Sequence, residues 1–311
     1  MVDLIALDLP LLAVTLILTC AIAVFAASAR RRAVIADVNI DAMHMSALRR
    51  ARQRAVAAIG ASVVVLVVMS ALGLSVAPLL GLPLLLAAPV SASVGLLLYS
   101  LIPAVRHAVS PSAARSASLT PRTVASYLSG SLSLPPIIAL ICLVAFVIVT
   151  GVTSSPDDLG LSRAIAFTSP DIVSASSPYA GWFYGLPLLG TCVVLIVVTI
   201  STMARISATP AFPDPALVSL DTAWRRESMR IVSAIAVFSL TLPFGGAAAV
   251  SGRALLSAVL PTSHPGWTAL GIMFVAMGLV SVVLSGVSLA FATRQALALP
   301  RASLRAAGPT R

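Results

Sequence analysis

Residues 49–74 read RRARQRAVAAIGASVVVLVVMSALGL, so four arginines precede twenty residues that carry no charge. A helix of about 20 apolar residues is long enough to cross a hydrocarbon core of roughly 30 Å. Arginine-rich segments beside such a helix stay on the cytoplasmic side of the membrane. The stretch is therefore typical of a transmembrane helix whose basic end lies at the cytoplasmic surface.

The rest of the chain has the composition of a membrane protein. Of its 311 residues, 59% are hydrophobic and 10% are charged, whereas a soluble domain is about half apolar and a quarter charged. We predict an all-α, polytopic membrane bundle of seven transmembrane helices, forming one domain over residues 1–293, with a disordered cytoplasmic tail at 294–311. The predicted spans are residues 9–27, 55–74, 80–105, 135–152, 182–204, 231–250 and 267–293.

The arginines predict the orientation of this bundle. All 20 basic residues are arginines, and 18 of them fall on the tail and on alternate connections between the predicted spans. Because short loops rich in arginine remain cytoplasmic, we predict an N-terminus outside the cell and a C-terminus in the cytoplasm. The absence of lysine, with abundant alanine and valine, suggests a high-GC genome and hence a bacterial plasma membrane. The net charge of +10 is explained by arginines that flank the spans on the cytoplasmic side of the lipid bilayer. No nucleic-acid partner is therefore expected.

Several classes of function find no support in the sequence. A retinal protein needs a lysine for its Schiff base, and the chain has none. No catalytic, nucleotide-binding or metal-binding motif is present, so we expect no enzyme, cofactor or metal site. The central parts of the second to seventh spans lack ionisable residues, which argues against a proton-coupled antiporter.

Besides the tight hairpin turn at residues 75–79, two connections are expected outside the cell, at residues 153–181 and 251–266. The longer one contains Asp157 and Asp158. This acidic pair is interpreted either as part of a solvated loop or as a weak cation site. Both connections are predicted to be loops.

Small residues recur in the seventh span. Gly271, Gly278, Ser285 and Ala292 follow one another at intervals of seven. Residues at this spacing form one narrow stripe on a helix, against which a neighbouring helix packs closely. We therefore predict a helix-packing face, with a substrate groove as the alternative interpretation.

Proline and glycine interrupt two of the spans. Pro243, Gly245 and Gly246 lie within the sixth span, and Pro83 and Pro89 lie within the third. Proline removes a backbone donor and kinks a helix. The interruption of the sixth span predicts either a pocket, where a cavity satisfies the freed backbone groups, or a simple kink.

Residues 177–187, SPYAGWFYGLP, are followed by Asp221 and by a basic helix from Arg225 to Arg230. Over roughly the second half of the chain, this pattern resembles a group of uncharacterised actinobacterial integral membrane proteins that are often encoded beside GntR-type regulators. The resemblance implies a bacterial inner membrane and a regulated operon. It carries over no activity and no catalytic or binding residue.

Two classes of function remain open. The first is a binding or partner subunit of a membrane complex, which docks a membrane or cytoplasmic protein through its arginine-rich inner segments at residues 33–54 and 215–230. The second is a transporter, either a permease or an exporter, for a small or lipophilic molecule, in agreement with the interrupted sixth span. The first is the preferred interpretation.

Overall fold

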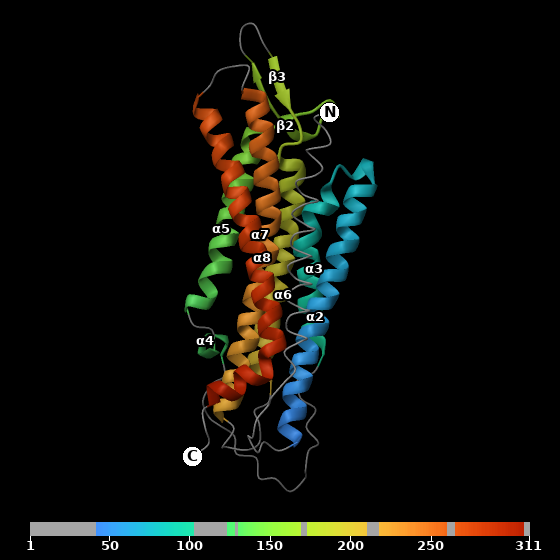
Figure 1. Ribbon diagram of the computed structural model, residues 1–311. Helices are drawn as coiled ribbons and strands as arrows, with labels where there is room; N and C mark the ends of the chain where they lie inside the picture. Colours follow the sequence, from blue (N-terminus) through green and yellow to red (C-terminus); the bar gives the residue numbers. More distant parts are fainter. Residues whose placement is uncertain are drawn as a thin grey trace.

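A computed structural model of the chain is an elongated helical bundle (Figure 1). Six helices of the described residues are long and apolar enough to cross a membrane, which agrees with a multi-pass membrane protein. The structure describes residues 42–102, 123–127, 130–168, 173–209, 218–259 and 265–307. The first predicted span, 9–27, lies outside these ranges, so the count of seven helices and the outward N-terminus stay predictions. The helices are α2 (Ala42–Ser75), η1 (Ala77–Leu79), α3 (Leu82–Leu101), α4 (Val124–Tyr127), α5 (Gly130–Thr153), α6 (Trp182–Ala208), α7 (Val218–Val259) and α8 (Pro265–Ala307).

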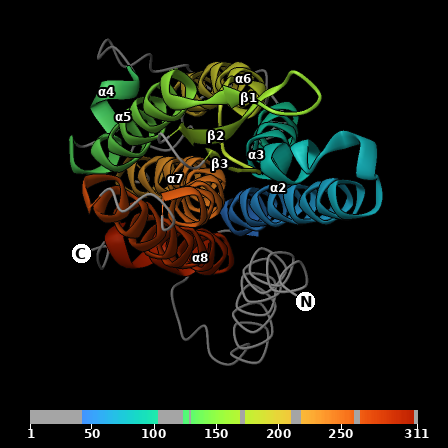
Figure 2. The same ribbon diagram turned by 90° about the horizontal axis from the view of Figure 1, so that it is seen from above.

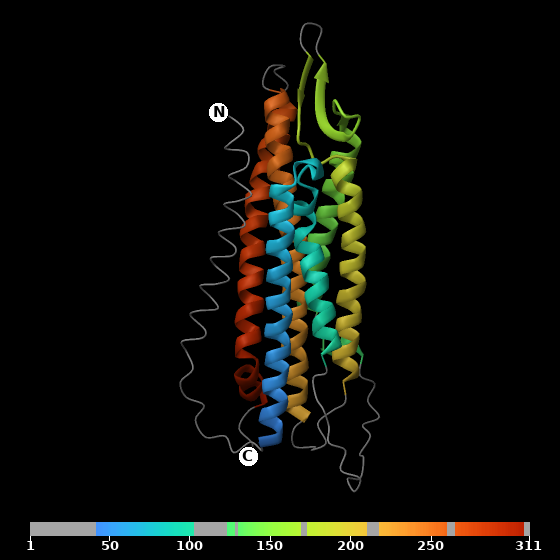
Figure 3. The same ribbon diagram turned by 90° about the vertical axis from the view of Figure 1, so that its right-hand side faces the viewer.

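Successive long helices run in opposite directions, so their ends gather at two poles of the bundle (Figure 3). One pole contains the starts of α2, α5 and α7 and the ends of α3, α6 and α8; we call it the arginine-rich end. The opposite pole carries a small β-sheet and two arginines. Nine arginines at this end have side chains that the structure describes. They are Arg49, Arg50, Arg52, Arg54, Arg205, Arg225, Arg226, Arg230 and Arg294.

Helix α7 is the centre of the bundle (Figure 2). In its most apolar stretch 83% of the residues are buried, against 28–44% in the other five spans. Its 42 residues make it about 63 Å long, which is twice the thickness of the hydrocarbon core. The helix contacts α3, α5, α6 and α8. Helix α7 begins before residue 231 and ends after residue 250, so it is longer than the predicted span at both ends.

The prediction of a loop at residues 251–266 is wrong for the first part of that segment. Helix α7 continues as far as Val259. Leu255 and Ala258 are fully buried in a cluster that also contains Ile165 of the sheet and Tyr179. Burial of these apolar side chains under the sheet stabilises the additional turns of helix.

Helices α7 and α8 approach each other through glycines. A Cβ atom on Gly245 would lie 2.9 Å from the carbonyl oxygen of Gly278, and one on Gly252 would lie 2.6 Å from that of Gly271. A Cβ on Gly278 would lie 2.7 Å from the backbone nitrogen of Ala249. Side chains larger than hydrogen do not fit at these positions, so the two backbones pack as closely as small residues allow.

The α2–α3 hairpin is tight, as predicted. Helix α2 ends at Ser75 and α3 begins at Leu82, with one 3-10 turn between them. Leu80 and Gly81 both have positive φ, of 51° and 77°, and the glycine provides the left-handed conformation at little steric cost. Pro83 falls in the first turn of α3, where its missing N–H has no helical acceptor, so only Pro89 lies inside that helix.

The segments at the arginine-rich end are more helical than expected. Residues 42–54 belong to the same helix as the second span. Helix α8 continues to Ala307, where a disordered tail was expected from residue 294. Ala296 is fully buried, because packing against the bundle continues beyond the predicted end of the span.

The connection between α5 and α6 is a β-sheet rather than a loop. Its strands β1 (Ser155–Pro156), β2 (Ser162–Thr168) and β3 (Val173–Ser176) pair antiparallel in that order. Ile165 pairs with Ser176 and points into the cluster at the end of α7. The backbone N–H of Ala180 donates to Ser251 Oγ of α7 at 2.9 Å. These contacts fix the sheet on the pole opposite the arginine-rich end.

The outer surface of the bundle is apolar. Many large aliphatic side chains are exposed along the helices. Such a surface is expected to contact lipid tails rather than water. Examples are Val64, Leu72, Ile141, Val152, Val193, Val197, Ile200, Leu279, Val283 and Val287.

Candidate functional site

The most unusual chemistry of the described residues lies at the arginine-rich end, where charged side chains are buried between helices. Arg225 is fully buried, and its partner Asp221 is only 7% exposed. Both belong to the first turns of α7, which enters the bundle at this pole. Buried charges are costly unless they are paired and hydrogen-bonded, so the surroundings of these two residues decide their role.

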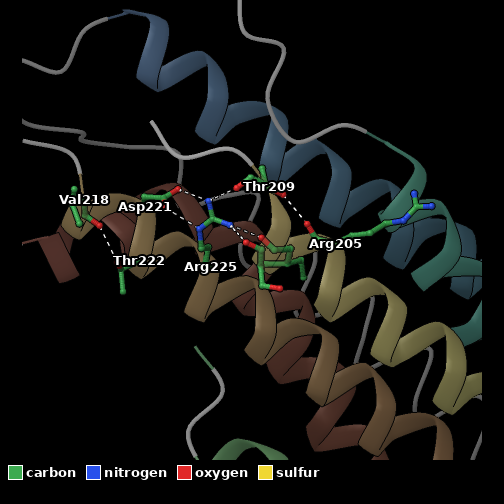
Figure 4. Close-up of polar contacts among 8 residues, drawn as sticks. Arg205, Thr209, Val218, Asp221, Thr222 and Arg225 are labelled. Carbon is green, nitrogen blue, oxygen red and sulfur yellow. Dashed lines mark hydrogen bonds and ion pairs between the residues drawn. The ribbon is translucent and has the colours of Figure 1, made fainter. Parts of the chain in front are cut away.

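The guanidinium of Arg225 is held on two sides (Figure 4). Its Nε and Nη2 donate to the two carboxylate oxygens of Asp221, at 2.9 and 3.1 Å. Its Nη1 and Nη2 also donate to the backbone carbonyls of Ile206, Ser207 and Thr209 at 2.5, 3.0 and 2.7 Å. These carbonyls form the end of α6, where a helix has no internal donors left. Arg225 therefore caps α6 and ties it to the start of α7.

Other arginines cap α3 in a similar way. Arg54 Nη1 donates to the carbonyl of Ile102 at 3.3 Å, and Arg205 Nη1 donates to that of Ser100 at 3.2 Å. Positive groups at the C-terminus of a helix also interact favourably with its dipole. Of the helices that end at this pole, α3 and α6 are thus closed by arginine side chains.

Arg54 is the second buried arginine, with 5% exposure. Its guanidinium carbon lies 4.0 Å from the centre of the Tyr99 ring and 5.9 Å from that of Trp224. The same tryptophan lies 5.3 Å from the guanidinium carbon of Arg225. Trp224 therefore lies between the two buried cations, in reach of the cation–π attraction of both.

Several buried polar atoms in this cluster have no hydrogen-bond partner. They include Nε and Nη2 of Arg54, the hydroxyl of Tyr99 and Nε1 of Trp224. On α7, Oε2 of Glu227 and the hydroxyl of Ser228 are also without a partner. Residues three and four apart share one face of a helix, so Glu227 and Ser228 lie on the face that carries Trp224. We call Arg54, Tyr99, Trp224, Glu227 and Ser228 the Arg54 cluster.

Glu227, the only glutamate of the chain, is paired within its own helix. Arg230 Nη1 donates to Glu227 Oε1 at 2.6 Å. The carboxylate is mostly buried, whereas the Arg230 side chain is 42% exposed. This pair was not predicted from the sequence. Glu227 lies three residues before Arg230, and that spacing was the signal that could have revealed it.

The surface of the arginine-rich end is strongly basic. Among the described residues, the two acidic side chains at this pole, Asp221 and Glu227, both pair with arginines of α7. The remaining arginines have no acidic partner within ion-pair distance in this part of the chain. The exposed ones are Arg49, Arg50, Arg52, Arg205, Arg226 and Arg294.

The predicted stripe of small residues lies at buried positions of α8. Gly271 and Gly278 contact α7. Ser285 and Ala292 are both fully buried, and the Ser285 hydroxyl donates to the carbonyl of Val282 at 2.7 Å. The arrangement is one of close helix packing along the length of the bundle.

The predicted interruption of α7 is absent. The helix is continuous across Pro243, Gly245 and Gly246. Gly245 packs against α8, while Phe244 meets Phe146 of α5 edge to face at 5.4 Å between ring centres. Pro243 and Gly245 are buried, and Gly246 is partly exposed. The pocket and the simple kink predicted for these residues stay predictions.

Asp157 stabilises a turn of the sheet at the opposite pole. Its Oδ1 accepts from the backbone N–H groups of Leu159 and Leu161 at 3.0 and 2.9 Å, and its Oδ2 pairs with Arg163. Partial burial raises the pKa of this carboxyl, but the hydrogen bonds from Leu161, Arg163 and Leu159 together lower it below 3.8. The carboxylate is thus engaged with the protein's own donors. Among the described residues, no three His, Cys, Asp or Glu side chains are grouped to hold a metal ion.

Comparisons with known proteins return no similar protein: no protein-family model matches the chain, and neither the characterised proteins nor the solved structures contain a match.

Proposed function

We propose that this protein is a membrane-embedded binding subunit whose arginine-rich end docks an acidic surface of a partner protein. The support is the set of exposed arginines contributed by α2, α6, α7 and α8 at one pole. A partner that supplies carboxylates complements this surface, and such complementarity speeds association and selects the partner. The buried Arg225 joins α7 to the end of α6, and the buried Arg54 joins α2 to the end of α3, so the exposed arginines of these helices are presented from a rigid platform.

We also propose that the arginine-rich end faces the cytoplasm of a bacterial cell. In this topology residues 9–27 form a further span and the N-terminus is outside. The support is the excess of arginine on one side, since 18 of 20 arginines fall on segments assigned to the cytoplasm, and basic residues near spans are retained there. The resemblance of residues 177–187 to a group of actinobacterial membrane proteins remains a hypothesis. It agrees with the bacterial membrane of this proposal.

The transporter is the alternative function. Its support from sequence was the interruption of α7, and that helix is continuous and closely packed at Pro243. No central ionisable residue offers an ion pathway in the described spans, because the buried charges lie near the ends of α2 and α7. The partner subunit is therefore the better-supported proposal.

The test is an affinity purification from the native host in mild detergent, followed by mass spectrometry. Two tagged variants are compared with the wild type. In the first, Arg49, Arg50 and Arg226 are replaced by glutamate; in the second, the matched control, Arg253 at the opposite pole is replaced by glutamate. We expect one stoichiometric partner with the wild type and with Arg253→Glu, and its loss with the triple variant.

A homogeneous protein without a companion in all three samples would contradict the proposal and direct attention to the transporter, for which ligand screening and flux assays follow. A partner that the triple variant retains would refute docking at the arginine-rich end. The folding of each variant is checked by its circular-dichroism spectrum and elution volume.

A further inference from the structure

The geometry points to an oxyanion-binding site at Arg54, which takes one carboxylate or phosphate group. This side chain is 95% buried, yet among the described residues only Nη1 of its guanidinium has a hydrogen-bond acceptor. Nε and Nη2 are buried and have no partner in this part of the chain. These two atoms form the edge of the guanidinium that matches two oxygens of a carboxylate or phosphate. The unpartnered groups are thus the two donors that bind an oxyanion together.

Arg225 shows how the chain satisfies the same edge elsewhere in this bundle. Its Nε and Nη2 donate to the two oxygens of Asp221, and its remaining donors bind backbone carbonyls. Arg54 has the carbonyl of Ile102 but no counterpart of Asp221. Since a buried cation without an anion is strongly disfavoured, the missing group of the Arg54 site is an anion.

The surroundings of Arg54 favour a negative ligand. The Tyr99 hydroxyl and Trp224 Nε1 are two further buried donors without acceptors, and both rings lie within 6 Å of the guanidinium carbon. Tryptophan Nε1 only donates hydrogen bonds. Of the two acidic groups on this part of α7, Asp221 binds Arg225 and Glu227 binds Arg230 through Oε1, which leaves Oε2 as the one unpartnered carboxylate oxygen among the described residues of the cluster. The donors of the cluster therefore exceed its acceptors.

The position of Arg54 suggests two sources for the anion. Arg54 is the last charged residue before the apolar run that begins at Ala55, so it lies at the depth of lipid headgroups. A headgroup phosphate reaches this depth from the bilayer. A soluble carboxylate or phosphate reaches it from the aqueous side, where Arg49, Arg50 and Arg52 are exposed and attract anions. Both sources supply the same bidentate oxyanion.

The experiment measures anion-dependent stability of the purified protein by thermal unfolding. The wild type is kept in micelles of a maltoside detergent, which carries no phosphate, and is titrated with inorganic phosphate, with chloride at matched ionic strength as the control. A second series adds phosphatidylglycerol to the micelles without inorganic phosphate. Arg54→Lys keeps the charge but loses the two-pronged edge, and Arg52→Gln removes an exposed arginine two residues away as the matched control.

We expect a saturable rise in melting temperature for the wild type and Arg52→Gln, and an apparent Kd for the anion at least about tenfold weaker in Arg54→Lys. A response to inorganic phosphate in lipid-free micelles assigns the anion to the aqueous side, and a response to phosphatidylglycerol alone assigns it to a headgroup. Equal responses of Arg54→Lys and the wild type, or no response to either source, overturn the proposal. Because no partner protein enters this test, its result is independent of the proposed docking function.

Discussion

Replacing Arg225 by methionine tests the central structural role assigned to the arginine-rich end. Methionine approximates the aliphatic part of arginine but carries no donor. The change removes both hydrogen bonds to Asp221 and those to the carbonyls of Ile206, Ser207 and Thr209. The lost contacts join the start of α7 to the end of α6.

The expected cost is large because the change leaves buried groups without partners. Breaking one side of a buried ion pair costs about 3–5 kcal/mol, because the remaining charge is uncompensated. Asp221, at 7% exposure, is such a charge, and each stranded carbonyl adds its own desolvation penalty. Typical proteins are stable by only about 5–15 kcal/mol in total, so Arg225→Met removes a large share of the stability.

The assay is unfolding of the detergent-solubilised protein, followed by far-ultraviolet circular dichroism. Arg226→Met is the matched control, because Arg226 is the exposed neighbour on the same helix and its loss is expected to cost less than about 0.5 kcal/mol. The double variant Asp221→Asn with Arg225→Met recovers part of the loss, since no buried charge then remains. Equal stability of Arg225→Met and Arg226→Met would refute the reasoning.

Three further predictions concern other parts of the molecule. Gly278→Ala lowers the free energy of unfolding by about 1–3 kcal/mol, because its Cβ would lie 2.7 Å from the backbone nitrogen of Ala249. Gly246→Ala is neutral or stabilising, because nothing lies within 4 Å of a Cβ at that position. Thermal unfolding of both variants distinguishes the packing effect from a general effect of replacing glycine. Because the pKa of Asp157 is lowered in the folded state, its carboxylate stabilises the fold above pH 3.8, and this contribution is lost as the pH falls through the lower folded-state pKa. Hydrogen exchange of residues 157–163 is therefore slower in the wild type than in Asp157→Asn at neutral pH. The difference disappears in strong acid. In a cysteine-free background, a membrane-impermeant reagent labels a cysteine at position 158 in intact cells but not one at 219; the reverse pattern would overturn the proposed orientation.

The helices that cross the membrane are the most predictable part of this protein. Six of the seven predicted apolar runs coincide with long helices. Hydropathy succeeds here because a helix is the only way for one segment to satisfy its own backbone in lipid. The ends were less predictable, as helices α2, α7 and α8 extend well beyond their apolar runs.

The sheet between α5 and α6 and the Arg54 cluster were not predicted. Strands β2 and β3 are seven and four residues long, and their alternation of apolar and polar residues is too short to separate from a loop. Asp221 and Arg225 lie four residues apart, and that spacing is equally compatible with an exposed pair. Helix α7 is continuous across Pro243, and the pocket and the simple kink considered there stay predictions.

The sequence by itself determined that the chain forms a membrane bundle and that its arginines gather on one side, because length, hydropathy and charge act locally along each segment. Only the tertiary structure decided which arginines are buried, since Arg225 binds carbonyls 16–19 residues away and Arg54 reaches rings on α3 and α7. The tertiary structure likewise decided that α7 is the central helix. Its close approach to α8 depends on glycines of both helices. Burial and pairing are properties of the neighbours that folding brings together, and no window along the chain contains them.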